Sequence, residues 1–329
     1  MLNNTTGTNN TAIGNSALAS NTTGQNNTAI GREALYANTT GQANIAIGTS
    51  AMPNSTTGVG NNAIGATSLQ NNLTGNGNAA NGQATLYSNR TGIQNTAMGS
   101  QAMRSNVAGN ANTGIGREAL RDTSSIIATL GAITPGSGYT DGTYTIVALE
   151  PNNDSYWIYP EATLVVAGGV VTTVTLTYAG IGMVVGATLT IDPATAPAGL
   201  LAGSGFSIPI STVTTGQHNT GLGYRAGAGN ITGNRNLFLG YNAGVNETGS
   251  DKLYISNSTT ATPLIKGEFD SAGGVTGLVR INGRFELAPA YVPANAADAG
   301  TQGQIALDTN YIYICTATDT WKRVAISTW

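Results

Sequence analysis

The hydrophobic and polar positions of the first 120 residues recur with a strict period of 17. The consensus is T-T-G-x-x-N-x-A-I-G-x-x-A-L-x-x-N. A helical hairpin repeat needs about 33 residues or more, and two glycines per period disfavour helix by about 1 kcal/mol each. The pattern therefore predicts a parallel β-solenoid (β-roll) in which each coil has two short strands and two Gly/Asn corners. The rows that keep the step are Gly7, Gly24, Gly41, Gly58, Gly75, Gly92, Gly109; Gly14, Gly31, Gly48, Gly65, Gly82, Gly99, Gly116; and Leu18, Leu35, Met52, Leu69, Leu86, Met103, Leu120.

An asparagine row keeps the same step and returns later in the chain. In stacked coils these side chains would hydrogen-bond to one another and satisfy buried corner amides. We therefore expect a structural ladder and not a ligand site. Its members are Asn10, Asn27, Asn44, Asn61, Asn78, Asn95, Asn112, Asn219 and Asn236.

The register stops near Arg121 and returns with Gly216 and Gly223. Gly116 and Gly223 are 107 residues apart, so subtracting one step of 17 leaves an insertion of about 90 residues. β-branched runs between glycine turns, at 163–166, 170–176 and 188–191, predict a small β-sandwich-like domain there.

The expected organisation is all-β. It comprises a seven-repeat solenoid shaft (1–121), an inserted β domain (122–213), two further solenoid repeats (214–250), a shaft-closing β region (251–288), a linker (289–303) and a C-terminal β tip or cap (304–329). A capping role for the last part is expected because solenoid ends must be covered.

The alanine row and the isoleucine row are adjacent in the sequence, and this leads us to expect an oligomer. Ala12 and Ile13 are neighbours, so in a strand they point to opposite faces. One narrow coil interior cannot bury both rows, and whichever row points outward forms an apolar stripe. Closed symmetry with three copies suits a solenoid fibre, so we expect a homotrimer. Asn81 interrupts the isoleucine row, and that coil should be locally weaker.

Composition excludes several functions. Charged residues make up 9% of the chain, the formal net charge is −3, and no stretch of 18 apolar residues occurs. Nucleic-acid binding and membrane insertion are therefore not expected. His218 is the one histidine and Cys315 the one cysteine, so we expect no metal site and no cofactor. The N-terminal residues lack the features of a secretory signal, so we expect assembly in a host cytoplasm.

The run Asn27-Thr28-Ala29-Ile30-Gly31 resembles the N-x-A-I-G repeats of trimeric autotransporter adhesin heads. That resemblance implies left-handed parallel β-rolls that trimerise. Longer repeats of this kind are similar to those of bacteriophage fibre and virion proteins. The stretches 252–257, 263–267, 280–283, 311–315 and 321–323 resemble the close of such fibre shafts. Without a signal peptide or membrane-anchor strands, the chain looks like a part of a virion.

Two aromatic groups are candidate receptor- or glycan-binding residues. One lies in the insertion and the other near the C-terminus, and either group could instead pack into a core. Their members are Tyr156, Trp157, Tyr159, Tyr311, Tyr313 and Trp321. Five acidic residues of the insertion could in principle supply a glycosidase pair, but nothing in their spacing singles out two; they are Asp141, Glu150, Asp154, Glu161 and Asp192.

The resemblance and the composition together predict a structural virion protein without enzymatic activity. We expect a phage tail fibre that adheres to a host-surface glycan or protein as a homotrimer, gaining affinity from three weak sites. Its other partners would be virion proteins of the tail, baseplate or capsid. The alternatives are a capsid decoration or head-fibre protein and, with less support, a glycan-degrading tailspike.

Overall fold

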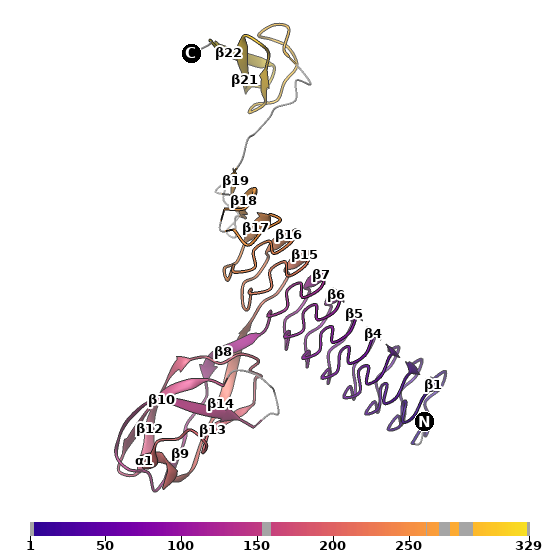
Figure 1. Cartoon of the computed structure of the whole chain (residues 1–329), viewed down its shortest axis with the longest axis vertical. Coiled ribbons are helices and arrows are strands. Elements are labelled where there is room, and N and C mark those ends of the chain that lie inside the picture. Colours follow the sequence, from indigo (N-terminus) through magenta and orange to yellow (C-terminus); the bar gives the residue numbers. More distant parts are fainter. Residues whose placement is uncertain (1–2, 153–158, 261, 270–276, 283–291, 328–329) are drawn as a thin grey trace. The chain divides into compact units, whose positions relative to one another are not determined.

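The computed structural model describes residues 3–152, 159–260, 262–269, 277–282 and 292–327. The chain divides into two compact units, Met1–Arg280 and Ile281–Trp329. The first unit holds a stack of coils with a domain inserted into it, and the second is a small sheet (Figure 1). No helix among the described residues is long and apolar enough to cross a membrane.

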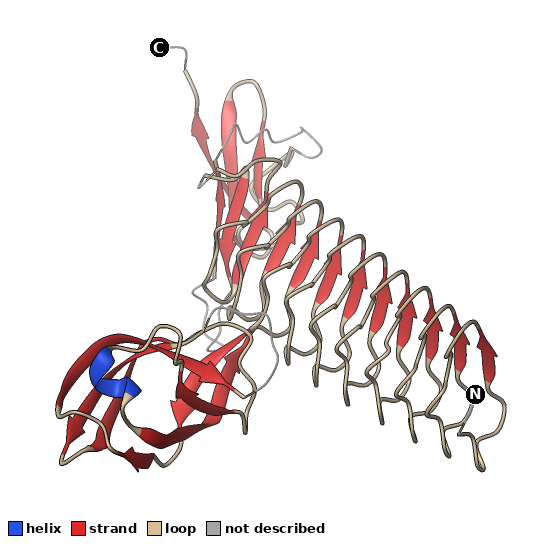
Figure 2. Cartoon of the chain, turned by 60° about the horizontal axis from the view of Figure 1, so that its bottom comes forward, coloured by secondary structure: helices blue, strands red, loops and turns tan. Residues whose placement is uncertain are grey.

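The coils stack through short parallel strands, which form one row in Figure 2. Each strand pairs in register with the strand one period later, as Thr11 does with Thr28. The stack continues across the insertion, because Thr113 pairs with Thr220. The strands are β1 (Thr11–Ile13), β2 (Thr28–Ile30), β3 (Ile45–Ile47), β4 (Asn62–Ile64), β5 (Ala79–Asn81), β6 (Thr96–Met98), β7 (Thr113–Ile115), β15 (Thr220–Leu222) and β16 (Leu237–Leu239). The predicted all-β parallel solenoid is confirmed.

The coil interior is filled by the alanine row and the leucine/methionine row. Ala46 and Met52, for example, are fully buried in the same core cluster. The isoleucine row points outward. Of the two arrangements that the sequence left open, the structure therefore has the alanine row inside the coil.

The expectation of two strands per coil is wrong for the described coils, each of which has one three-residue strand. The remainder of each coil runs through turns. Leu18 has φ 49° and its counterparts in later coils have nearly the same value. A left-handed residue in every coil breaks the extended backbone, while hydrogen bonds such as Leu18 N–H to Ala34 O (3.0 Å) still join the coils.

Large and small residues are exchanged after the insertion. Phe238 takes the place of the inward alanine, and Gly227 and Gly244 take the place of the leucine row. A side chain at either glycine would overlap the Phe238 ring. The Phe238 ring thus fills interior space next to these glycines, as the leucine row does in the earlier coils.

The coil sheet ends in three strands: β17 (Lys252–Ile255), β18 (Ile265–Glu268) and β19 (Leu278–Ile281). β17 stacks parallel on β16, and β18 then pairs antiparallel with β17. The described part of this region therefore changes strand direction at the end of the stack.

The insertion enters and leaves through paired strands, since Ser125 of β8 lies opposite Thr215 of β14. Its strands are β8 (Ser125–Leu130), β9 (Thr134–Ser137), β10 (Gly142–Pro151), β11 (Glu161–Ala167), β12 (Val170–Tyr178), β13 (Thr188–Ile191) and β14 (Ser204–Thr215), with helix α1 (Ala198–Leu201) before β14. They form one seven-stranded sheet with the order β12-β11-β10-β13-β14-β8, and β9 also pairs with β14.

This sheet curls around a single core. β9 lies against β12, and the N–H of Tyr139 donates to the carbonyl of Gly169 (3.1 Å) between β11 and β12. The two sides of the sheet therefore approach each other, where the sequence had indicated a sandwich-like domain. Curling gives the same result as a sandwich, a β-rich layer on each side of one buried cluster.

The second unit contains an antiparallel sheet of β20 (Ile305–Leu307), β21 (Tyr311–Ala317) and β22 (Thr320–Ala325). Its core consists of Ala306, Tyr313, Cys315 and Trp321. Part of the expected linker, residues 289–291, lies outside the described residues.

Candidate functional site

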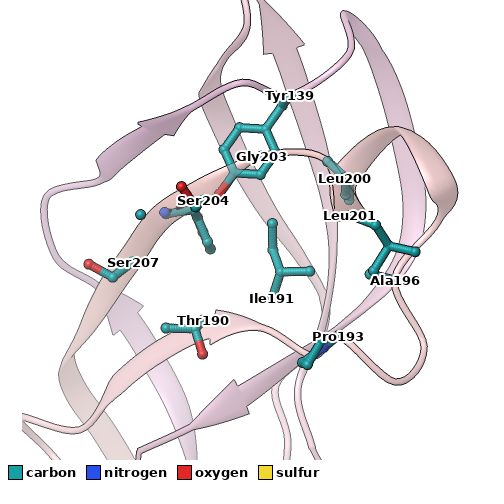
Figure 3. Close-up of a pocket in the computed structure, with 12 residues that line it drawn as sticks. Tyr139, Thr190, Ile191, Pro193, Ala196, Leu200, Leu201, Gly203, Ser204 and Ser207 are labelled. Carbon is teal, nitrogen blue, oxygen red and sulfur yellow. Dashed lines mark hydrogen bonds between the residues drawn. The ribbon is translucent and has the colours of Figure 1, made fainter.

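The inserted domain holds a cavity of about 440 Å³ beside α1. It lies where β13 and β14 separate, because their ladder consists of the pairs Thr188–Pro209 and Leu189–Ile208. Figure 3 shows side chains from the end of β13, from α1 and from the start of β14 around this space. The cavity falls within the size range of small-ligand pockets, about 300–1,000 Å³.

Tyr139 forms one wall, and its position depends on glycine. The ring lies directly against Gly203, where a Cβ atom would overlap it. The hydroxyl oxygen of Tyr139 accepts a hydrogen bond from the N–H of Phe206 (3.1 Å). Tyr139 therefore joins the segment after β9 to the first residues of β14, beside the cavity that it lines.

The cavity combines an apolar wall with a hydroxyl-bearing rim. Ile191, Leu200 and Leu201 contribute apolar surface, and Thr190, Ser204 and Ser207 contribute hydroxyl groups. None of its lining residues is charged. Apolar carbon faces beside several hydroxyls suit a polyhydroxylated ring, which has both kinds of surface.

The aromatic residues predicted in the insertion are not brought together among the described residues. Tyr156 and Trp157 lie outside the described residues. Tyr159 is 39% exposed and stands just before β11. The sequence did not single out the cavity residues. The signals available were two glycines just before Tyr139, at Gly136 and Gly138, and Gly203 far along the chain.

The predicted C-terminal aromatics mostly form the core of the second unit. Tyr313 is 7% and Trp321 5% exposed, which leaves little surface for a ligand. The Tyr313 hydroxyl donates to Asp308 Oδ2 (2.7 Å), and the Arg323 guanidinium lies 4.1 Å from the centre of the Tyr311 ring. Tyr313 and Trp321 border a smaller cavity of about 260 Å³.

The hydrogen bond from Tyr313 lowers the pKa of Asp308, and the backbone N–H groups of Asn310 and Tyr311 act in the same direction. The same bond raises the pKa of Tyr313. These groups hold the turn between β20 and β21, so their arrangement is explained by stability of the small sheet.

The asparagine row forms a continuous hydrogen-bonded column. In the middle of the shaft, Asn44 Nδ2 donates to Asn27 Oδ1 (3.1 Å) and to the carbonyl of Gly58 (2.7 Å). The column crosses the insertion, where Asn219 Nδ2 donates to Asn112 Oδ1 (3.1 Å). Its amides are occupied by one another, which accounts for them without a ligand. In the described part of the chain no group of histidine, cysteine or carboxylate side chains is arranged to hold a metal.

Comparison with known proteins finds short matches to phage enzymes. The chain is 58% identical over 38 residues to the protein "Depolymerase, capsule K30/K69-specific" of Klebsiella phage K64-1, a match of 12% of this chain and 5% of that protein. It is 50% identical over 36 residues to "Depolymerase 1, capsule K30/K69-specific" of Klebsiella phage K5-2, covering 11% of this chain and 4% of that protein. No family model matches, and no solved structure matches.

The matches and the solenoid together fit a phage fibre-like β-solenoid protein and indicate a phage tail-associated one. They correct one prediction. We expected a protein without enzymatic activity, and this is contradicted because both relatives are named depolymerases. The sequence gives the glycan-degrading alternative less support because no acidic pair stands out in it.

Proposed function

We propose that this chain is part of a phage tail-associated depolymerase that binds and cleaves a capsular polysaccharide. The observation that carries the proposal is the 58% identity over 38 residues to a capsule-specific depolymerase. That length corresponds to just over two periods of 17 residues. The hydroxyl-lined cavity of the insertion supports a sugar ligand independently of that match.

The shaft supports a homotrimer as the working form. Ile13, Met98 and Ile115 are 58%, 45% and 39% exposed along one row of the coil stack. Covering each such side chain contributes about 1.5–3 kcal/mol, so several coils together favour association of copies. Three copies would present three insertions to one capsule, and the avidity of three weak sites would exceed the affinity of one.

In this proposal the shaft supplies rigidity and the insertion supplies recognition. Tail or baseplate proteins of the virion are the expected structural partners, and the host capsule is the expected target. Adhesion, which the sequence indicated as the main role, becomes the binding step that precedes cleavage.

The test uses the purified full chain and capsular polysaccharides of a strain panel that includes capsule types K30 and K69. We expect at least one polysaccharide to be shortened, measured by size-exclusion chromatography and by new reducing ends. Sedimentation velocity on the same sample should give three chains per particle. If no polysaccharide on the panel is shortened, the depolymerase assignment fails.

A further inference from the structure

Strand register brings two glutamates of the insertion together. β10 and β11 are antiparallel, with Ala148 opposite Glu161. The ladder continues one step further, because the N–H of Leu149 donates to the carbonyl of Pro160 (2.8 Å). Glu150 therefore lies two residues along from Ala148, diagonal to Glu161 and on the same face.

That face is the outer one. Leu149 and Pro160 are buried on the inner side, whereas Glu150 is exposed and Glu161 half-buried. Diagonal neighbours of this kind have Cβ atoms about 7 Å apart. Two glutamate side chains at that spacing can place their carboxyl groups at the separations of about 5–9.5 Å that glycosidases use.

Two exposed tyrosines lie beside this pair. The register sets Tyr178 of β12 opposite Glu161, and Tyr159 precedes Glu161 by two residues, on the same face. Tyr178 is 38% and Tyr159 39% exposed, which is enough ring surface for a sugar to stack on. Burial and the charge of Glu161 both raise the pKa of Tyr178, which agrees with a short distance between the two side chains.

The pair adjoins the cavity through Thr190. Thr190 lies on its rim and pairs with Glu150 across β13 and β10. The cavity and the outer face are thus neighbouring parts of one surface. A chain of sugars with one ring in the cavity would continue over Thr190 toward Glu150. Among the described residues, neither glutamate forms a salt bridge or a side-chain hydrogen bond.

We propose that Glu150 and Glu161 are the carboxylate pair that cleaves the glycosidic bond of a polysaccharide held by the cavity and by Tyr159 and Tyr178. The inference rests on the depolymerase function proposed above, and it places that activity in the insertion.

The step is a hydrolysis in which water is the co-reactant. Glu161, between the tyrosines, gives its proton to the glycosidic oxygen as the bond from that oxygen to the anomeric carbon breaks. Exposed Glu150 takes a proton from water as the water oxygen bonds to the same carbon. The products are two shorter sugar chains, one with a new reducing end, and the protons are balanced between the two carboxyl groups.

The test compares Glu150→Gln and Glu161→Gln with Glu33→Gln, a matched change in the shaft. Using a polysaccharide that the wild-type chain shortens, we expect each site variant to release reducing ends at least about 100-fold more slowly. Binding of the uncleaved polymer should change less than about threefold, because the amide keeps the shape of the side chain. The Glu33→Gln variant should cleave at the wild-type rate.

A second variant guards against a purely structural effect. Glu161→Asp retains the carboxyl group but moves it by one methylene, and we expect cleavage between that of wild type and that of Glu161→Gln. If both glutamine variants cleave within threefold of wild type, the assignment of the pair is overturned while the depolymerase function stands. If the wild-type chain cleaves none of the polysaccharides, the function itself fails and the pair with it. Loss of cleavage together with loss of binding would also overturn the catalytic assignment.

Discussion

Asn61 offers the sharpest test of what holds the coils together. Its amide donates to Asn44 Oδ1 (3.2 Å) and to the carbonyl of Gly75 (2.8 Å). Its oxygen accepts from the backbone N–H (3.0 Å) and the Nδ2 (3.2 Å) of Asn78. Asn61→Ala removes all four bonds. In this variant the Gly75 carbonyl still accepts a hydrogen bond from Asn72 Nδ2 (3.1 Å). The buried backbone N–H of Asn78, in contrast, loses the acceptor that Asn61 Oδ1 provided.

A buried N–H without a partner costs about 1–3 kcal/mol, and the lost side-chain bonds add about 1 kcal/mol net. We therefore expect the local opening free energy to fall by about 2–4 kcal/mol. Hydrogen exchange of the coils around β4 and β5 should become about 30- to 700-fold faster, since each 1.4 kcal/mol is a factor of ten.

The matched control is Asn54→Ala, because Asn54 is exposed and its Nδ2 donates to Asn71 Oδ1 (3.3 Å) at the surface. Removing it should cost under about 0.5 kcal/mol. Equal exchange rates in the two variants would refute the conclusion that the buried amide column holds the stack.

Three further predictions follow from other parts of the chain. Gly203→Ala places a methyl group in the Tyr139 ring. We expect the free energy of unfolding of the insertion to fall by about 1–3 kcal/mol and oligosaccharide binding, measured by calorimetry, to weaken. Unchanged binding would contradict the role of the cavity. The double change Met98→Glu and Ile115→Glu should convert trimers to monomers in sedimentation velocity, and an unaltered trimer would show that this row is not the interface. The lowered pKa of Asp308 means that its contribution to stability is present above about pH 3.9 and is lost as the pH falls through the lowered value; exchange of the β21 amides should rise in that window, and Asp308→Asn should abolish the pH dependence.

The repeat could be predicted from the sequence because a period of 17 has few structural solutions. Gly14 and its successors have φ near 124–135° in most coils, and a Cβ atom there would strike the backbone of the next coil. That requirement appears directly as a glycine row. The left-handed backbone conformation of Leu18 could not be predicted in this way, because a leucine does not indicate a positive φ as a glycine does. Burial of its side chain, worth about 1.5–3 kcal/mol, offsets a backbone cost of about 1–2 kcal/mol.

The candidate site could not be predicted from the sequence, for a different reason. Glu150 and Glu161 are neighbours because of strand pairing, and a bulge between Tyr144 and Val147 shifts that pairing by one residue. A one-residue shift changes which side chains share a face. Tyr139 likewise meets Gly203 only through the curl of the sheet. At the C-terminus the strands could be placed from alternation, but the burial of Trp321 depends on the loop that covers it, where Trp321 Nε1 donates to the carbonyl of Asp298 (3.2 Å).

The pairing of Thr113 with Thr220 has a consequence for how such a protein changes over time. Because the coil before the interruption rests directly on the coil after it, the rod does not depend on what is looped out between them. The exit and entry strands lie side by side at Ser125 and Thr215, so any domain with adjacent termini fits the same gap. The module between these two strands can thus be exchanged without redesigning the rod that carries it.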